Sequence, residues 1–265
     1  MDIIKSIILG IVEGITEFLP VSSTGHLIIA NEFISFSPEL NKIFDIFIQL
    51  GAILSVVIIY RKKLFPVKDV AKREYNHLLK MLIISSLPIL VIGFLLHSYI
   101  ITYLFSSLTV AIALIFWGIG IILIDKRQHR VKIDSLYKID GKSALFIGLV
   151  QCLALIPGTS RSAVTIIGAL LLGVTSTIAV EYSFFLAIPA LSAASLFSLI
   201  STEFQYSHHE IIILTVGFLT SFITACLAIR FFIRYIRKHG FHVFGYYRII
   251  LGLVVLAYFS IKNIL

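Results

Sequence analysis

The sequence predicts an all-α integral membrane protein with six full transmembrane helices and two re-entrant broken helical hairpins in an inverted-topology repeat. Three observations lead to this prediction: an apolar composition, eight long apolar stretches and a similarity between the two halves of the chain. Of the 265 residues, 58% are hydrophobic and only 14% are charged, and the mean hydropathy is +1.02. A soluble domain of this length would carry many more charged residues on its surface.

Six apolar stretches are long enough to cross a hydrocarbon core, which takes about 20 residues per helix. Two further apolar stretches, 3–34 and 143–173, are interrupted by Pro, Gly and small hydroxyl residues at 19–26 and 156–162. Irregular backbone at membrane depth is tolerated only where protein buries it or where it lines a cavity, so both stretches predict re-entrant hairpins. The six predicted spans lie near 43–60, 81–98, 104–124, 179–200, 211–230 and 244–263.

The positions of the basic residues predict the orientation of the bundle. Seventeen of the 22 Lys and Arg residues fall in three connections, whereas the connections at 99–103 and 201–210 hold none. Because cytoplasmic loops are enriched in Lys and Arg, the basic connections should face the cytoplasm and both termini should lie outside. The same pattern explains the net charge of +8 without a nucleic acid partner. The three sets are Arg61, Lys62, Lys63, Lys68, Lys72, Arg73 and Lys80; Lys126, Arg127, Arg130, Lys132, Lys138 and Lys142; and Arg230, Arg234, Arg237 and Lys238.

The chain forms a single membrane domain, 1–265, in which two halves resemble each other. The repeats cover approximately 1–124 and 143–265 and are joined by the basic cytoplasmic loop 125–142. Each half holds one hairpin and three spans, an odd number, so the halves are predicted in opposite orientations with their hairpin tips meeting inside the membrane. The corresponding positions are 10–13 with 148–151, Pro20 with Pro157, and Asp45 with Glu181.

Two carboxylates precede the first break. Glu13 and Glu17 are four residues apart, so both side chains lie on one face of a helix. Charges inside a membrane are costly and point to a function, although a pair at the outer interface is the structural alternative. Paired carboxylates can hold a hard divalent cation such as Mg²⁺ or Ca²⁺. Alternatively, one carboxylate transfers a proton while the other steadies a base.

The first break itself carries hydroxyl groups and an imidazole. Ser23 lies three residues before His26, with Ser22 and Thr24 beside it and Gly25 freeing the backbone. A hydroxyl near an imidazole, with a carboxylate to orient the ring, is an arrangement that activates a weak nucleophile. A polar loop of this kind also presents backbone N–H groups to a phosphate. Taken alone, His26 would more often be a buried histidine with a structural role.

The second break supplies a positive charge. Arg161 lies between Ser160 and Ser162, far from either end of its apolar stretch. A guanidinium binds phosphate in a bidentate manner and compensates the two glutamates. Gln49 shares a helix face with Asp45, and Glu181 is the counterpart of Asp45 in the second half. Gln49 and Glu181 could line the same cavity, and a role in helix capping or packing is an equally supported alternative.

Two segments of the sequence resemble the signatures of a known protein family. Residues 13–26, EGITEFLPVSSTGH, closely resemble the first signature of the bacterial undecaprenyl-diphosphatases, also called bacitracin-resistance proteins. Residues 157–162, PGTSRS, resemble their second signature, and the similarity continues through 49–52 and 181–184, over essentially the whole chain. Ala163 stands where the family usually has glycine.

The resemblance implies a polyprenyl diphosphate lipid substrate within the bacterial plasma (inner) membrane. The implied enzyme converts undecaprenyl diphosphate to undecaprenyl phosphate on the outer, periplasmic side, recycles the carrier for cell-wall polymers, confers bacitracin resistance and needs a divalent cation. Membrane lipids are the remaining expected partners, and a homodimer is left open.

The residues and the resemblance together give a hypothesis for the site. Ser23 attacks the terminal phosphorus with His26 as base, although His26 or a metal-activated water are rival nucleophiles. An anion or polyprenyl-phosphate transporter or flippase is the alternative function, because inverted repeats with broken helices are typical of carriers. The assigned roles are catalysis by Ser23, His26 and Glu17, phosphate binding by Arg161, Ser22, Thr24 and Ser160, and metal binding by Glu13 and Glu17.

Overall fold

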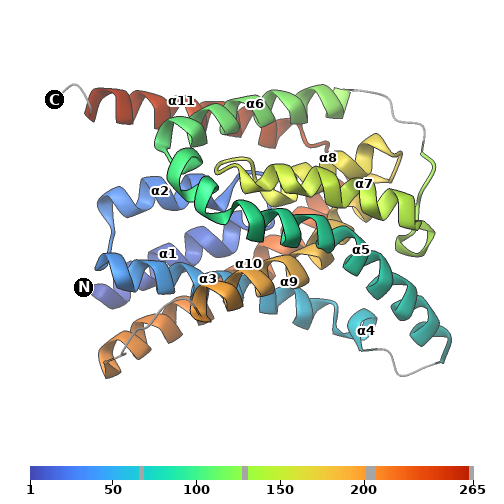
Figure 1. The fold of residues 1–265 in the computed structure, drawn as a ribbon, viewed down its shortest axis with the longest axis horizontal. Helices are drawn as coiled ribbons and strands as arrows, with labels where there is room; N and C mark the ends of the chain where they lie inside the picture. The colour runs from blue at the N-terminus through green and yellow to red at the C-terminus, as the bar shows by residue number, and fades with distance from the viewer. Residues whose placement is uncertain (66–68, 127–130, 201–206, 263–265) are drawn as a thin grey trace.

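The computed structural model describes residues 1–65, 69–126, 131–200 and 207–262, and these form an all-α membrane protein (Figure 1). Six helices of the described chain are long and apolar enough to cross a membrane. The only β pairing in this part is an isolated bridge between Ile133 and Val174. The six long helices are α3 (Pro38–Ile59), α5 (Asp69–Tyr99, continued by a π-helix, Ile100–Leu104), α6 (Ser107–Lys126), α9 (Ser176–Ile200), α10 (His208–Ile236) and α11 (His242–Lys262).

The long helices extend beyond the apolar stretches that predict them. An apolar stretch ends at the first charged residues, whereas the helix itself continues to the capping residue at its end. Ser37 caps α3 with Pro38 in the first turn, and Ser207 caps α10 through a reciprocal capping box with Glu210. A helix begins at each of these signals, several residues before the predicted span.

Two segments predicted as loops between spans are helical in the structure. Residues 99–103 are helical, and the turn instead falls at Phe105 and Ser106, where the Ser106 side chain accepts a hydrogen bond from the Thr109 N–H. The basic connection between the first two spans is also largely helical, because α4 (Arg61–Leu64) and the first turns of α5 occupy it. Lys68, Arg127, Arg130 and the connection at 201–206 lie outside the described residues.

Both interrupted stretches are broken helical hairpins, as predicted. The first consists of α1 (Asp2–Thr16) and α2 (Ser23–Phe33). The second consists of α7 (Gly141–Gln151), a 3-10 turn (Cys152–Leu155) and α8 (Arg161–Leu171). A crossing helix takes about 20 residues, so no single arm of either hairpin is long enough to span the membrane.

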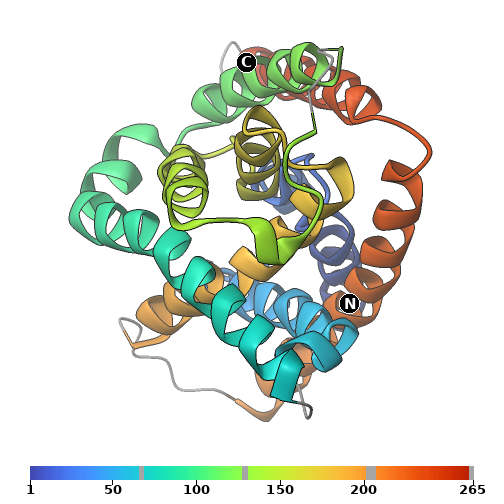
Figure 2. The same ribbon diagram turned by 90° about the vertical axis from the view of Figure 1, so that its right-hand side faces the viewer.

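The hairpins pack against helices that are distant in sequence. Helix α1 lies along α10, and α7 lies along α5, so each hairpin contacts a long helix of the other half. Figure 2 shows α7 and α8 near the centre of the molecule with the long helices around them. Gly14 permits the first approach, since a Cβ atom there would lie 2.5 Å from the Ser221 carbonyl oxygen. Small residues at such contacts are typical of membrane helices.

The two ends of the bundle differ. Helix α1 begins and α11 finishes at one end, and α4 lies at the other (Figure 1). At the end with α4, the Asp125 carboxylate accepts hydrogen bonds from the backbone N–H groups of Phe241 and His242, which joins α6 to α11. Outside the spans, hydrogen bonds from the side chain and backbone of Ser143 lower the pKa of the Asp140 carboxyl, which caps α7. The inverted orientation of the halves stays a prediction.

Candidate functional site

Both breaks end in the same local geometry. Ser22 and Ser160 have φ angles of 72° and 71°, and no other non-glycine residue of the described chain has a positive φ. Each serine caps the helix that follows, accepting a hydrogen bond from Gly25 N–H or Ala163 N–H at 3.3 Å. Strained backbone of this kind, costing about 1–3 kcal/mol per residue, is concentrated at functional sites. Both serines, predicted to bind phosphate, thus serve as helix caps.

The residues that follow the two caps, one in each hairpin, both contact Glu17. Ser23 and Arg161 are the first residues of α2 and α8. The Ser23 hydroxyl donates to Glu17 Oε2 at 2.8 Å, and Arg161 Nη2 donates to Glu17 Oε1 at 3.3 Å. Glu17 and Arg161 are 7% and 8% exposed, whereas Ser23 is partly accessible. A hydroxyl, a carboxylate and a guanidinium therefore meet where the hairpin tips meet.

Arg161 is held in place by hydrogen bonds, but one of its N–H groups has no partner among the described residues. Its Nη1 donates to the backbone oxygen of Ser183 in α9 at 2.8 Å. Its Nε is buried and has no hydrogen-bond partner among the described residues. Buried donors are almost always paired, and leaving one unpaired costs about 1–3 kcal/mol. The unpaired N–H is a donor that an anionic ligand would satisfy.

Glu13 lies one turn before Glu17 and is 1% exposed. Its Oε2 has no partner among the described residues, and α3, which carries Asp45, packs against α1. The described chain holds no group of three His, Cys, Asp or Glu side chains able to bind a metal. Mg²⁺ in phosphate-processing sites commonly takes one or two carboxylates plus substrate oxygens, so Glu13 and Glu17 fit a cation that the substrate helps to hold.

Both ring nitrogens of His26 have partners other than Ser23. Its Nδ1 lies 2.8 Å from the Ser22 carbonyl oxygen, and its Nε2 lies 2.6 Å from the Tyr247 hydroxyl in α11. The Ser23 hydroxyl is directed instead to Glu17. The spacing of three residues between Ser23 and His26 allows their side chains to meet. The contact of His26 with Tyr247 of α11 orients the imidazole differently.

The remaining predicted residues lie in different surroundings. Thr24 is the second residue of α2 and is partly accessible beside the site. Gln49 Oε1 accepts a hydrogen bond from Ser195 Oγ at 3.4 Å, which links α3 to α9. Glu181 forms an ion pair with Lys63 at 2.8 Å, and this pair joins α9 to α4. Helix packing accounts for the observed contacts of Gln49 and Glu181.

Sequence reasoning missed Arg248, which is fully buried in α11. Its guanidinium donates to the Pro20 oxygen of the first break at 3.3 Å and to the Gly158 and Thr159 oxygens of the second break at 2.9 Å each. One side chain thus ties both breaks together. An arginine inside the last apolar stretch was the available signal, and it is the same kind of signal that identified Arg161.

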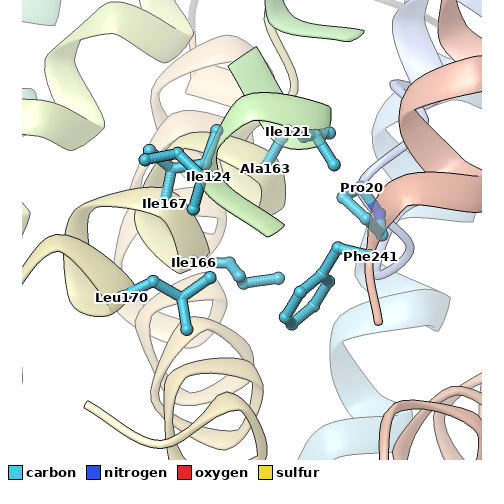
Figure 3. A pocket seen from close by; sticks show the side chains of 8 residues that line it. All are labelled: Pro20, Ile121, Ile124, Ala163, Ile166, Ile167, Leu170 and Phe241. Atoms are coloured by element: carbon cyan, nitrogen blue, oxygen red, sulfur yellow. The ribbon is translucent and has the colours of Figure 1, made fainter. Parts of the chain in front are cut away.

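A small cavity beside the breaks is entirely apolar (Figure 3). It offers no polar side chain to a diphosphate or a cation. The methyl group of Ala163 borders it, so the departure from the usual glycine is accommodated here. The lining residues are Pro20, Ile121, Ile124, Ala163, Ile166, Ile167, Leu170 and Phe241.

Fold and site together define a multi-pass membrane protein with a buried polar centre where two broken hairpins meet. The model of the family described as bacitracin resistance protein BacA matches residues 6–254, and the chain belongs to that family. It is 49% identical to undecaprenyl-diphosphatase 1 of Clostridioides difficile, over 98% of this chain and 97% of that protein. It is also 48% identical to undecaprenyl-diphosphatase 1 of Chromobacterium violaceum, over 95% and 94%, and 42% identical to the undecaprenyl-diphosphatase of Parvibaculum lavamentivorans, over 99% and 98%.

Proposed function

We propose that this protein is an undecaprenyl-diphosphatase, which hydrolyses undecaprenyl diphosphate to undecaprenyl phosphate and inorganic phosphate. The names of its relatives support the substrate. The observation that carries the chemistry is the contact of Glu17 with both Ser23 and Arg161. A nucleophile, a proton acceptor and a phosphate-binding cation are thereby placed within one hydrogen-bonded cluster.

Ser23 is the proposed nucleophile. Its oxygen attacks the terminal phosphorus while its proton passes to Glu17, and the bond from that phosphorus to the bridging oxygen breaks. The bridging oxygen leaves with undecaprenyl phosphate, and water then hydrolyses the phosphoserine to release inorganic phosphate. Because the Ser23 hydroxyl already donates to a carboxylate, the geometry favours Ser23 over His26 as nucleophile, with Glu17 rather than His26 as the first proton acceptor.

Arg161 is proposed to bind the diphosphate. Phosphoryl transfer depends mainly on positioning and charge neutralisation, and the unpaired Nε of Arg161 supplies both a donor and a positive charge. The helices that begin at Ser23 and Arg161 also direct the positive ends of their dipoles toward the tips, which favours an anion there.

Glu13 and Glu17 are proposed to hold a divalent cation, Mg²⁺ or Ca²⁺. When bound, such a cation neutralises charge on the diphosphate. The buried, unpaired oxygen of Glu13 supports this role. Glu17 then has to serve both the cation and Ser23, which makes it the most sensitive carboxylate of the site.

The site is proposed to face the outer side of the bacterial plasma membrane. The basic residues near α4 and in the 125–142 connection favour a cytoplasmic location for that end of the bundle. A long isoprenyl chain cannot leave the bilayer, so an intramembrane site receives the head group while the chain remains in lipid. In this role the enzyme recycles the lipid carrier for cell-wall synthesis and confers bacitracin resistance.

The test is phosphate release from undecaprenyl diphosphate by the detergent-purified protein, with Mg²⁺, with Ca²⁺ and with EDTA. We expect cation-dependent release that falls at least about 100-fold in Ser23→Ala, Glu17→Gln and Arg161→Lys. The matched controls are Thr215→Ala, whose hydroxyl bonds only its own helix, and the exposed Arg234→Gln. Both should retain wild-type activity.

Trapping the phosphorylated residue and mapping it by mass spectrometry assigns the nucleophile. Label on Ser23 is expected, and label on His26 would overturn this assignment. Lipid binding without phosphate release by folded wild-type protein would instead favour the carrier function.

A further inference from the structure

We propose that Tyr247 is a positioning residue of this site, which holds His26 in one tautomer with its Nε2 lone pair directed toward α11. The role in the reaction rests on the proposed diphosphatase function. The hydrogen-bond geometry of the histidine does not rest on it.

In the observed ring orientation, the Ser22 carbonyl requires the proton of His26 to be on Nδ1. A carbonyl oxygen can only accept hydrogen bonds, so the Nδ1 atom, 2.8 Å away, has to be the donor. The backbone N–H of His26 donates to the same oxygen at 3.3 Å. The ring is thereby tied to the serine that caps its own helix, and the tautomer follows from the acceptor chemistry.

Tyr247 completes the arrangement from the other side. With Nδ1 protonated, the Nε2 of a neutral imidazole is an acceptor, and the Tyr247 hydroxyl donates to it at 2.6 Å. The two rings are nearly parallel, with an interplanar angle of 6° and centroids 5.5 Å apart. The next residue, Arg248, anchors this part of α11 to both breaks, so the tyrosine hydroxyl is fixed relative to α2.

This arrangement has a consequence for Ser23. The imidazole is kept away from the Ser23 hydroxyl, and the hydrogen bond from Ser23 to Glu17 is therefore undisturbed. Without the tyrosine hydroxyl only the Ser22 contact would orient the ring, so a larger fraction of His26 side chains would rotate away and sample the other tautomer. A rotated imidazole would compete for the Ser23 hydroxyl, which lowers the rate of the chemical step more than it weakens substrate binding.

The first experiment is a double-mutant cycle on phosphate release. Tyr247→Phe keeps the ring and removes only the hydroxyl, and we expect kcat to fall about tenfold with KM changed less than about twofold. In a His26→Gln background the same substitution should have no further effect. Tyr246→Phe is the control, since Tyr246 is similarly exposed and its ring contacts His242 instead. Equal losses from Tyr247→Phe with and without His26 would overturn the proposal.

The second experiment does not depend on turnover. In ¹⁵N-histidine NMR at about pH 8, above the usual histidine pKa of about 6.5, His26 is assigned by comparison with His26→Gln. We expect a single Nδ1–H tautomer in the wild-type protein and a mixture in Tyr247→Phe, whereas an unchanged spectrum would overturn the proposal. If the wild-type protein released no phosphate, the proposed function would fail while this measurement still decided the role of Tyr247.

Discussion

Two buried arginines near the site have different partners. Arg161 faces the carboxylate of Glu17, and the Nε of each arginine lacks a hydrogen-bond partner among the described residues. In the described part of the chain, the terminal nitrogens of Arg248 donate only to backbone oxygens, from both breaks and from Ala113. It therefore satisfies carbonyl groups that the interrupted helices leave without partners.

Replacing Arg248 should reduce both stability and activity. Arg248→Met leaves the oxygens of Pro20, Gly158 and Thr159 without this donor, and each unpaired buried group costs about 1–3 kcal/mol. We expect a lower Tm in detergent and slower phosphate release even well below that Tm. Arg248→Lys should recover part of the loss, because an ammonium group keeps the charge but not the forked geometry. The exposed Arg230→Met is the control, and an unchanged Tm in Arg248→Met would contradict the assigned role.

At the scale of the elements, close helix contacts place the first hairpin. Gly10 and Gly14 of α1 lie directly against the backbone of α10, where a Cβ atom at Gly14 would also meet the Thr224 side chain. Membrane helices gain little from the hydrophobic effect when they associate, so their contacts depend on close packing of this kind. The position of Glu17 relative to Arg161 therefore depends on the contact between α1 and α10.

A single methyl group tests this contact. Gly14→Ala should lower Tm and reduce phosphate release, because the added carbon would lie 2.5 Å from the Ser221 oxygen and the helices have to separate. Gly120→Ala is the control, since a Cβ atom there comes no closer than 3.6 Å to Trp117. Equal Tm values for the two variants would show that the α1–α10 distance is not critical.

At the scale of the whole molecule, the predicted orientation can be tested by labelling. In a Cys152→Ser, Cys226→Ser background, Glu39→Cys should react with a membrane-impermeant maleimide from outside intact cells. Lys132→Cys should react only after the membrane is opened, because its connection is predicted to be cytoplasmic. Both residues are exposed, so accessibility within the protein does not separate them. The reverse pattern would place the site on the cytoplasmic side.

Hydropathy and helix-breaking residues predicted the long helices and both hairpins, because a bilayer accepts few alternatives to helical backbone. The residues of the polar centre were predictable for the same reason, and Arg248 could have been included. Their pairing was not predictable. Whether Ser23 contacts Glu17 or His26 depends on Tyr247, 221 residues further along the chain than His26, and such contacts follow from packing rather than from local spacing.

Each hairpin packs against a long helix of the other half, and this has a consequence for the synthesis of the protein. Helix α1 is synthesised first, yet the helix against which it packs begins only at His208. Through most of translation the carboxylates of Glu13 and Glu17 therefore lack both their final helical neighbour and Arg161. The first hairpin therefore reaches its final contacts only after α10 has been made, and we expect a chain truncated before α10 to leave these carboxylates without the helix that covers them.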